Sequence, residues 1–305
     1  MFTLNYETGK IESWTGESFT ANRKLDVWTL TIRPGVEWSD GELFTADDVV
    51  FTINTLLNDS TQSLGNAASM QQWVKRVEKT GLLTVRFDLK SPNPRFKLDY
   101  FSVRVGSSMV ILPEHIWADQ DPSTFKFYDS NKGWPIGTGA YRLVSASLNE
   151  FVFDRRDDWW GAKTGFRPLP QPKRLIWVTT GVEENRALQA VNNQLDSITD
   201  ITLGAFESIR TQNPKVVAWK NKMPYAWLDP CPRQLSVNHT IPPWDNPEMR
   251  QALSLIIDRQ QVVKIAYEDI SFPSKTIFVE YAGYISTPFG ICGSTLKVMV
   301  LLDSN

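Results

Sequence analysis

The stretch from Trp28 to Val50, WTLTIRPGVEWSDGELFTADDVV, decides the fold of this 305-residue chain. Apolar side chains such as Leu30 and Ile32 alternate with polar ones, which predicts a β-strand with one buried face. Pro34-Gly35 and Asp40-Gly41 are turn dipeptides. The stretch therefore predicts a strand, a turn, a short second strand and another turn.

A helix is predicted directly after the second turn. Thr45 can accept a hydrogen bond from the first turn of this helix, and Asp47 and Asp48 place negative charge where free N–H groups and the helix dipole favour it. Apolar residues then recur at helical spacing and give the helix one buried face that ends near Asn58. They are Val49, Ile53, Leu56 and Leu57.

The composition of the chain limits the classes of protein to which it can belong. Hydrophobic residues make up 42% of the chain and charged residues 22%, which is typical of a folded globular protein. A net charge of -2 gives no electrostatic case for binding nucleic acid. No apolar run approaches the length that spans a bilayer, and the first residues lack the features of a signal peptide. The 12 Trp and 16 Phe are flat apolar side chains of the kind that line ligand clefts as well as cores.

Other segments predict further helices and strands. A second helix is expected from Ser69 to Lys79, followed by an alternating strand over residues 83–89. Thr180 and Glu183 have the spacing of a capping box. Further helices are expected to begin after Thr202, Asn246 and Asp258, and further strands over residues 151–153, 174–178 and 216–219.

Three motifs follow one another along the chain. The first is the stretch over residues 28–49, the second is Gly137-Thr-Gly-Ala-Tyr141, and the third is PEMRQALSLIIDR over residues 247–259. Together they resemble the extracytoplasmic solute-binding proteins of ABC importers, in the oligopeptide- and dipeptide-binding group called family 5. The glycines of the second motif differ from a phosphate-binding loop, which would carry Lys followed by Ser or Thr.

The resemblance implies an α/β fold of the two-lobe periplasmic-binding-protein type (class II, family 5), with a mixed sheet and an inserted subdomain. It fades after about Tyr267 and covers only the N-terminal part of such a protein, so a truncated chain is expected. The implied domains are residues 1–57 as the first part of lobe I, 58–135 as its inserted subdomain, 136–245 as the return of lobe I, 246–290 as the incomplete start of lobe II, and 291–305 as an atypical tail.

The resemblance also implies a function. Such a chain would capture an oligopeptide or an oligosaccharide in the periplasm or elsewhere outside the cytoplasm and deliver it to a membrane permease. It would be a monomer that uses no cofactor or metal and is not an enzyme. A truncated interaction module or non-functional fragment is one alternative, and a hydrolase is another. The sequence has no Gly-x-Ser-x-Gly elbow and no His-Glu-x-x-His motif, which disfavours the hydrolase. Because part of the second lobe is missing, weak ligand binding is expected.

Five residues are candidate ligand contacts. The resemblance places Asp200 at the end of a strand that commonly faces ligand, and it places Trp227, Asp229 and Cys231 in a hairpin that lines the cleft of peptide-binding relatives. Trp134, beside the glycine-rich motif, completes the set. Each of the five also has a structural interpretation. For the two tryptophans the reason is that aromatic residues are found in a core more often than in a ligand site.

His115 and the two cysteines raise separate questions. His115 is expected to be structural or exposed, because no partner for an acid-base pair lies near it in the sequence. Cys231 and Cys292 permit one disulfide, and the sequence leaves open whether they pair.

Overall fold

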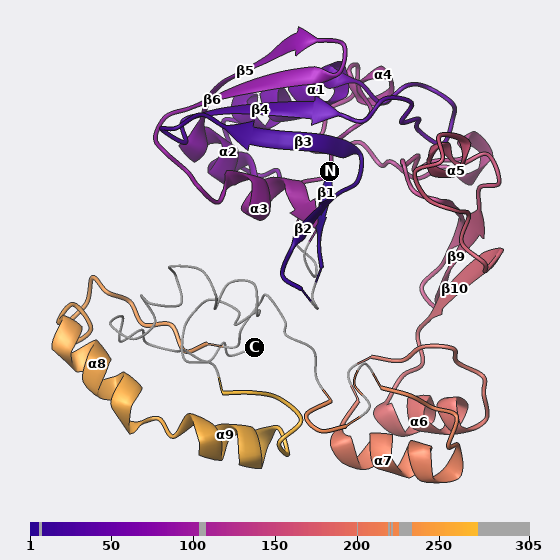
Figure 1. Ribbon diagram of the computed structural model, residues 1–305, viewed down its shortest axis with the longest axis vertical. Coiled ribbons are helices and arrows are strands. Elements are labelled where there is room, and N and C mark those ends of the chain that lie inside the picture. Colours follow the sequence, from indigo (N-terminus) through magenta and orange to yellow (C-terminus); the bar gives the residue numbers. More distant parts are fainter. Residues whose placement is uncertain are drawn as a thin grey trace. The chain divides into compact units, whose positions relative to one another are not determined.

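The computed structural model describes residues 1–5, 8–103, 108–199, 201–218, 220, 222–225 and 234–273. The chain divides into two compact units (Figure 1). The first unit contains Met1–Thr3 and Ile11–Thr179, and the second contains Leu4–Lys10 and Thr180–Asn305. Four of the five candidate contacts, and both cysteines, lie outside the described residues.

A four-stranded antiparallel sheet is the centre of the first unit. Its strands are β3 (Gly16–Ala21), β4 (Val27–Ile32), β5 (Val74–Gly81) and β6 (Thr84–Leu89), in the order β3-β4-β6-β5. In β4 the alternation predicted from the sequence is confirmed, because Leu30 and Ile32 are fully buried whereas Thr29 is exposed. One face of the sheet is therefore apolar and the other polar.

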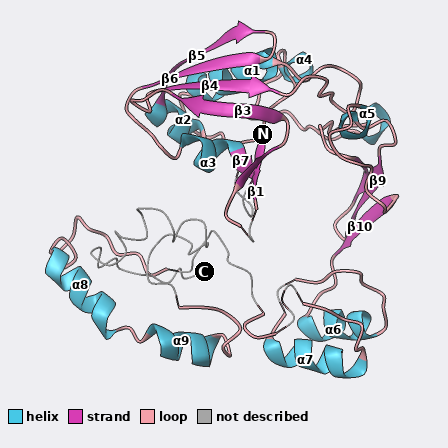
Figure 2. Ribbon diagram, viewed as in Figure 1, coloured by secondary structure: helices cyan, strands magenta, loops and turns pink. Residues whose placement is uncertain are grey.

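Three helices contribute to the core on the apolar face of this sheet: α1 (Ala46–Asn58), α2 (Ala67–Trp73) and α3 (Phe96–Phe101) (Figure 2). Aromatic rings fill the space between the helices and the sheet. Phe87 of β6 lies 5.5 Å from Phe19 of β3, 5.7 Å from Phe96 and 5.3 Å from Phe101, measured between ring centroids. Such tilted and edge-on contacts add to the free energy gained by burying the rings.

Helix α1 begins as the sequence predicts. The backbone N–H of Asp47 donates to Thr45 Oγ1, and the backbone N–H of Thr45 donates to Asp48 Oδ2 at 2.8 Å. These reciprocal bonds form a capping box, which satisfies N–H groups that would otherwise lack a partner. Strand β4, the turns and helix α1 are confirmed in this order, but the predicted short second strand between the turns is wrong, because only an isolated bridge between Glu37 and Leu43 forms within these described residues.

The predicted helix from Ser69 to Lys79 is wrong in its second half. Helix α2 ends at Trp73, and strand β5 begins at Val74. Val74 and Val77 are both buried, and this spacing of three resembles a helical pattern. The spacing arises from a register shift between Val74 and Arg76, where an irregularity in the strand changes the alternation.

A second antiparallel sheet in the first unit contains β8 (Tyr141–Ala146), β9 (Glu150–Arg155) and β10 (Arg174–Val178), in the order β10-β9-β8. The strands expected over residues 151–153 and 174–178 are thereby confirmed. Short elements complete the unit: β1 (Phe2–Leu4), β2 (Ile11–Ser13), β7 (Ser102–Val103), α4 (Glu114–Trp117), a 3-10 turn at Ser130–Lys132 and α5 (Trp160–Lys163).

The second unit contributes four described helices: α6 (Glu183–Val191), α7 (Leu203–Gln212), α8 (Pro247–Ile256) and α9 (Arg259–Ala266). The predicted N-caps Thr202, Asn246 and Asp258 are confirmed, because each side chain accepts a hydrogen bond from the first turn of its helix. Among the residues that the structure describes, no helix combines the length and apolarity needed to cross a bilayer.

Two expectations for the second unit are wrong. The capping box of Thr180 and Glu183 does not form, because the N-cap of α6 is Val182 and Glu183 Oε1 instead accepts from the Thr202 backbone N–H. Gly181 lies between them with φ +70°, which turns the chain before the helix can begin. The expected strand over residues 216–219 is also wrong. None of the described residues in this range pairs in a sheet, and Val217 is 79% exposed.

Replacing Phe87 by Ala should lower the free energy of unfolding of the first unit by about 3–5 kcal/mol, because it leaves a cavity beneath three aromatic rings. Leu82→Ala is the matched control, since Leu82 lies in the adjacent hairpin with a side chain that is 61% exposed. Urea denaturation of each variant, followed by circular dichroism, measures the change in its free energy of unfolding. Equal midpoints for the two variants would contradict the core described above.

Candidate functional site

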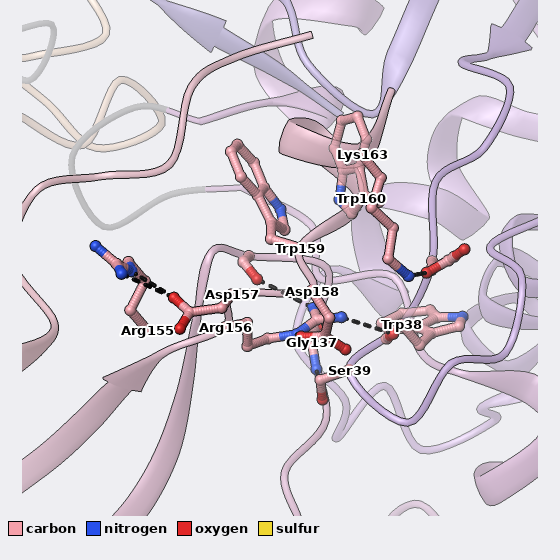
Figure 3. Close-up of polar contacts among 12 residues, drawn as sticks. Trp38, Ser39, Gly137, Arg155, Arg156, Asp157, Asp158, Trp159, Trp160 and Lys163 are labelled. Carbon is pink, nitrogen blue, oxygen red and sulfur yellow. Dashed lines mark hydrogen bonds and ion pairs between the residues drawn. The ribbon is translucent and has the colours of Figure 1, made fainter. Parts of the chain in front are cut away.

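Two of the three sequence motifs, the first and the second, meet at one place in the first unit (Figure 3). We call this place the Arg156 joint. It brings together the turn after β4, the glycine-rich segment before β8 and the segment after β9. Its members are Trp38, Ser39, Gly137, Thr138, Gly139, Arg156, Trp159 and Trp160.

The guanidinium of Arg156 donates to carbonyl oxygens on both sides of the joint. Nη2 lies 3.1 Å from Trp38 O, a residue 118 positions away in the chain. Nη1 lies 3.1 Å from Gly139 O and 3.3 Å from Gly137 O. The side chain is only 2% exposed. A planar guanidinium with several N–H groups can hold carbonyls of separate segments at fixed angles.

Burial and nearby carboxylates act on the charge of Arg156 in opposite directions. Burial lowers the pKa of the guanidinium, and the nearby carboxylate of Asp158 opposes that effect. Asp158 Oδ1 lies 3.7 Å from Arg156 Nε, but the Asp158 side chain is 67% exposed and its charge is screened by solvent. Arginine remains protonated under such conditions because its ordinary pKa lies far above neutral pH.

Two tryptophans fix the glycine-rich segment from the other side. The indole N–H groups of Trp159 and Trp160 both donate to Thr138 O, at 3.0 and 2.7 Å. Both rings are buried. Gly161 is required beside them, because a Cβ at this position would lie 2.4 Å from the Trp159 ring. The Trp-Trp-Gly sequence therefore has a packing and hydrogen-bonding role.

Helix α5 and the loop after it make a second set of contacts with the segment after β4. The ring of Phe166 stacks on the ring of Trp160, with centroids 5.3 Å apart. The guanidinium carbon of Arg33 lies 4.2 Å from the centroid of the Phe166 ring. Lys163 Nζ forms an ion pair with Glu37 at 2.7 Å. Lys163 is 48% exposed, so this pair contributes little to stability.

Trp134 is the one predicted contact residue within the described part of the chain. It is partly buried in a group of aromatic rings, 5.7 Å from Phe125 and 5.6 Å from Phe127 between centroids. The ammonium of Lys132 lies 4.5 Å from its ring centroid. These contacts show that Trp134 packs, and they leave its role toward a ligand untested. Asp200, Trp227, Asp229 and Cys231 lie outside the described residues, and so does Cys292.

Asp48 has a role that the sequence did not predict. Besides completing the capping box of α1, its Oδ1 accepts the backbone N–H of Glu114 at 3.0 Å, at the start of α4. Burial raises the pKa of the Asp48 carboxyl, whereas the backbone hydrogen bonds from Thr45 and Glu114 lower it. Burial, followed by the charges of Asp47 and Asp48, also raises the pKa of Glu114. One carboxylate thus fixes the start of two helices.

His115 has a partner that is distant in the sequence. Its Nε2 lies 2.8 Å from Asp40 Oδ2, in the turn that precedes α1. No partner lies near His115 in the sequence, but the fold supplies one 75 positions away, because it brings α4 against that turn. The structural role expected for His115 agrees with this contact.

Within the described ranges, no three His, Cys, Asp or Glu side chains gather as metal ligands. An open concavity of about 320 Å³ lies at the end of α1, lined in part by Asn58, Asp59, Asp121 and Ser123. None of the predicted contact residues lines it. The carboxylates of Asp59 and Asp121 are occupied by hydrogen bonds from their own loops, which lower the pKa of both.

A family model described as bacterial extracellular solute-binding proteins, family 5 (middle region), matches residues 10–289. The chain belongs to this family. The predicted family is confirmed, and so is the predicted α/β fold class, that of the two-lobe periplasmic binding proteins.

Relatives and solved structures agree with this assignment. The glutathione-binding protein GsiB of Salmonella paratyphi A is 25% identical over 271 residues, which are 87% of this chain and 47% of that protein. The periplasmic oligopeptide-binding protein of Thermotoga maritima is similar in fold, with a TM-score of 0.70 and 23% identity over 95% of this chain and 52% of that one. Its mannohexaose-bound form has a TM-score of 0.65 and 25% identity over 88% and 47%. The chain spans about half the length of the relatives it matches.

Replacing Arg156 by Met should lower the free energy of unfolding of the first unit by about 2–4 kcal/mol, because three carbonyls lose their donor and one of these bonds, to Trp38 O, is fully buried. Lys163→Met is the matched control in the same joint and should cost less than about 1 kcal/mol, since its ion pair is exposed. Thermal and urea denaturation of the two variants measure how much stability each substitution removes. A loss for Lys163→Met as large as that for Arg156→Met would contradict this ranking.

Proposed function

We propose that this chain acts in capturing a small-molecule solute outside the cytoplasm, as a monomeric binding component that delivers its ligand to an ABC permease. The family match over residues 10–289 carries this proposal. The convergence of two of the sequence motifs on the Arg156 joint supports it, because the residues that carry the resemblance also hold the first unit together. No catalytic step and no cofactor form part of the proposal.

The ligand we propose is an oligopeptide or an oligosaccharide. One relative is a glutathione-binding protein. The Thermotoga maritima protein belongs to an oligopeptide transporter and has been captured with mannohexaose. Both ligand classes need flat apolar side chains and a few placed hydrogen-bonding groups. A chain with 12 Trp in 305 residues can supply the apolar surface for either class.

The contact residues we propose are the five predicted from the sequence. Trp134 is only partly buried, so part of its ring is available to a ligand despite its packing. Asp200 and Asp229 would accept hydrogen bonds from sugar hydroxyls or from a peptide amine. Trp227 and Cys231 would add apolar surface beside them.

Capture in this class would couple ligand binding to closure of two lobes, because a ligand that contacts both lobes favours the closed state by its differential affinity. The chain spans about half the length of its relatives. We therefore propose that these 305 residues by themselves bind the ligand more weakly than a two-lobe relative does, since fewer groups surround the ligand.

Thermal melting followed by tryptophan fluorescence tests this function. A pool of peptides or a pool of oligosaccharides that contains a ligand should raise the melting temperature of the chain. At a ligand concentration about 100 times Kd the stabilisation is about 2.7 kcal/mol. A shift with one pool identifies the ligand class. Unchanged melting with both pools at millimolar concentration would contradict the proposal.

Two variants separate a ligand contact from general packing. Trp134→Ala should weaken binding of the active pool, whereas Trp177→Ala should leave it unchanged, although Trp177 is also a large aromatic and is 67% exposed. Each variant's own melting temperature without ligand serves as its baseline. Equal weakening by both substitutions would remove Trp134 from the proposed contacts.

A further inference from the structure

The two larger sheets of the first unit share no strand. One has the order β3-β4-β6-β5 and the other β10-β9-β8. Their relative orientation must therefore be fixed by side chains and loops. We propose that Arg156 is the positioning residue that sets this orientation, so that the whole first unit moves as one rigid body. The inference goes beyond the proposed function, because it holds with no ligand present.

The place of Arg156 in the chain supports this role. It directly follows β9 and thus belongs to the three-stranded sheet, and its backbone N–H donates to Ala140 O, next to the start of β8, at 2.8 Å. Its Nη2 donates to Trp38 O, in the segment between β4 and α1. The same side chain is bonded to both sides of the joint.

The shape of the guanidinium makes the connection directional. Nη1 reaches Gly137 O and Gly139 O while Nη2 reaches Trp38 O, and the nitrogens of the guanidinium lie in one plane. Rotating one sheet against the other would break at least one of these bonds. Because the side chain is 2% exposed, water cannot readily replace the lost donor.

Other contacts of the joint are less suited to this role. The indole groups of Trp159 and Trp160 bond only Thr138, which lies on the same side of the joint as β8. The Lys163 to Glu37 pair crosses the joint, but it is exposed and its long side chains tolerate rotation. Phe166 crosses it through apolar and cation-π contacts, which fix distance more than angle.

A stabilising residue and a positioning residue differ in what their removal changes. Loss of stability alone lowers the melting temperature but leaves the folded molecule with one arrangement of its sheets. Loss of positioning lets the folded molecule sample several arrangements. The distance between the two sheets therefore reports on positioning independently of stability.

Electron-electron double resonance on the 305-residue chain measures that distance. With Cys231 and Cys292 changed to Ser, nitroxide labels are attached at Leu82→Cys and Leu148→Cys, in the hairpins of the two sheets. These side chains are 61% and 97% exposed. The chain with Arg156 intact should give a narrow distribution, and Arg156→Met should widen it about two-fold or more.

Three further variants complete the test. Arg156→Lys keeps the charge without the planar fork and should also widen the distribution. Lys163→Met should leave the width unchanged. Phe87→Ala lies in the aromatic core of the four-stranded sheet, among Phe19, Phe96 and Phe101 and not among the joint residues, and controls for lost stability. It should lower the melting temperature and keep the narrow distribution.

Circular dichroism and the melting temperature confirm that each variant is folded at the temperature used before labelling. The proposal is overturned if both Arg156→Lys and any folded Arg156→Met give the narrow distribution. It is equally overturned if a folded Phe87→Ala variant widens the distribution as much as the Arg156 variants, since the width of the distribution would then depend on stability alone. Because no ligand is added, failure of the proposed solute binding would not affect either result.

Discussion

A buried guanidinium must find acceptors for its N–H groups, and in this chain that requirement fixes the arrangement of the first unit. Arg156 is almost wholly buried, and carbonyls of Trp38, Gly137 and Gly139 accept from its two Nη groups, whereas its Nε–H has no hydrogen-bond partner among the described residues and its Nε lies 3.7 Å from Asp158 Oδ1. Leaving such donors unpaired costs more free energy than a typical hydrogen bond contributes. The turn after β4 and the glycine-rich segment must therefore approach the end of β9 together. This constraint explains why motifs about a hundred residues apart occur in the same chain.

The same constraint bears on the proposed solute capture. Closure of two lobes around a ligand is productive only when each lobe keeps its own shape. In the first unit, the aromatic core holds the four-stranded sheet to its helices, and the Arg156 joint connects that sheet to β8, β9 and β10. Asp48 adds a connection between α1 and α4. Family membership is established by the match over residues 10–289, and the ligand and the permease are proposals that rest on it.

Local chemistry in the sequence was sufficient to predict much of this structure. Strand β4, the turn and the start of α1 depend on alternation, Gly and Pro turns and a capping box, which all act over a few residues. Strand β5 was mistaken for helix because an irregularity spaced its buried valines as a helix would. The second bond of Asp48 and the Asp40 partner of His115 could not be predicted, because each joins residues more than 60 positions apart. The family resemblance identified the motifs, but their meeting at Arg156 needed the three-dimensional structure. Of the predicted contacts, the described residues place only Trp134.

Hydrogen exchange within the first unit tests the central role of Arg156 most directly. The backbone N–H of Arg156 bonds to Ala140 O inside the joint, whereas Leu30 lies in the fully buried centre of the four-stranded sheet. In the native chain both amides should exchange only through unfolding of the unit, at similar slow rates. In Arg156→Lys the amide of residue 156 should exchange much faster by local opening while that of Leu30 remains protected. If the two amides keep equal rates in the variant, the joint opens only with the core and Arg156 does not hold the sheets together.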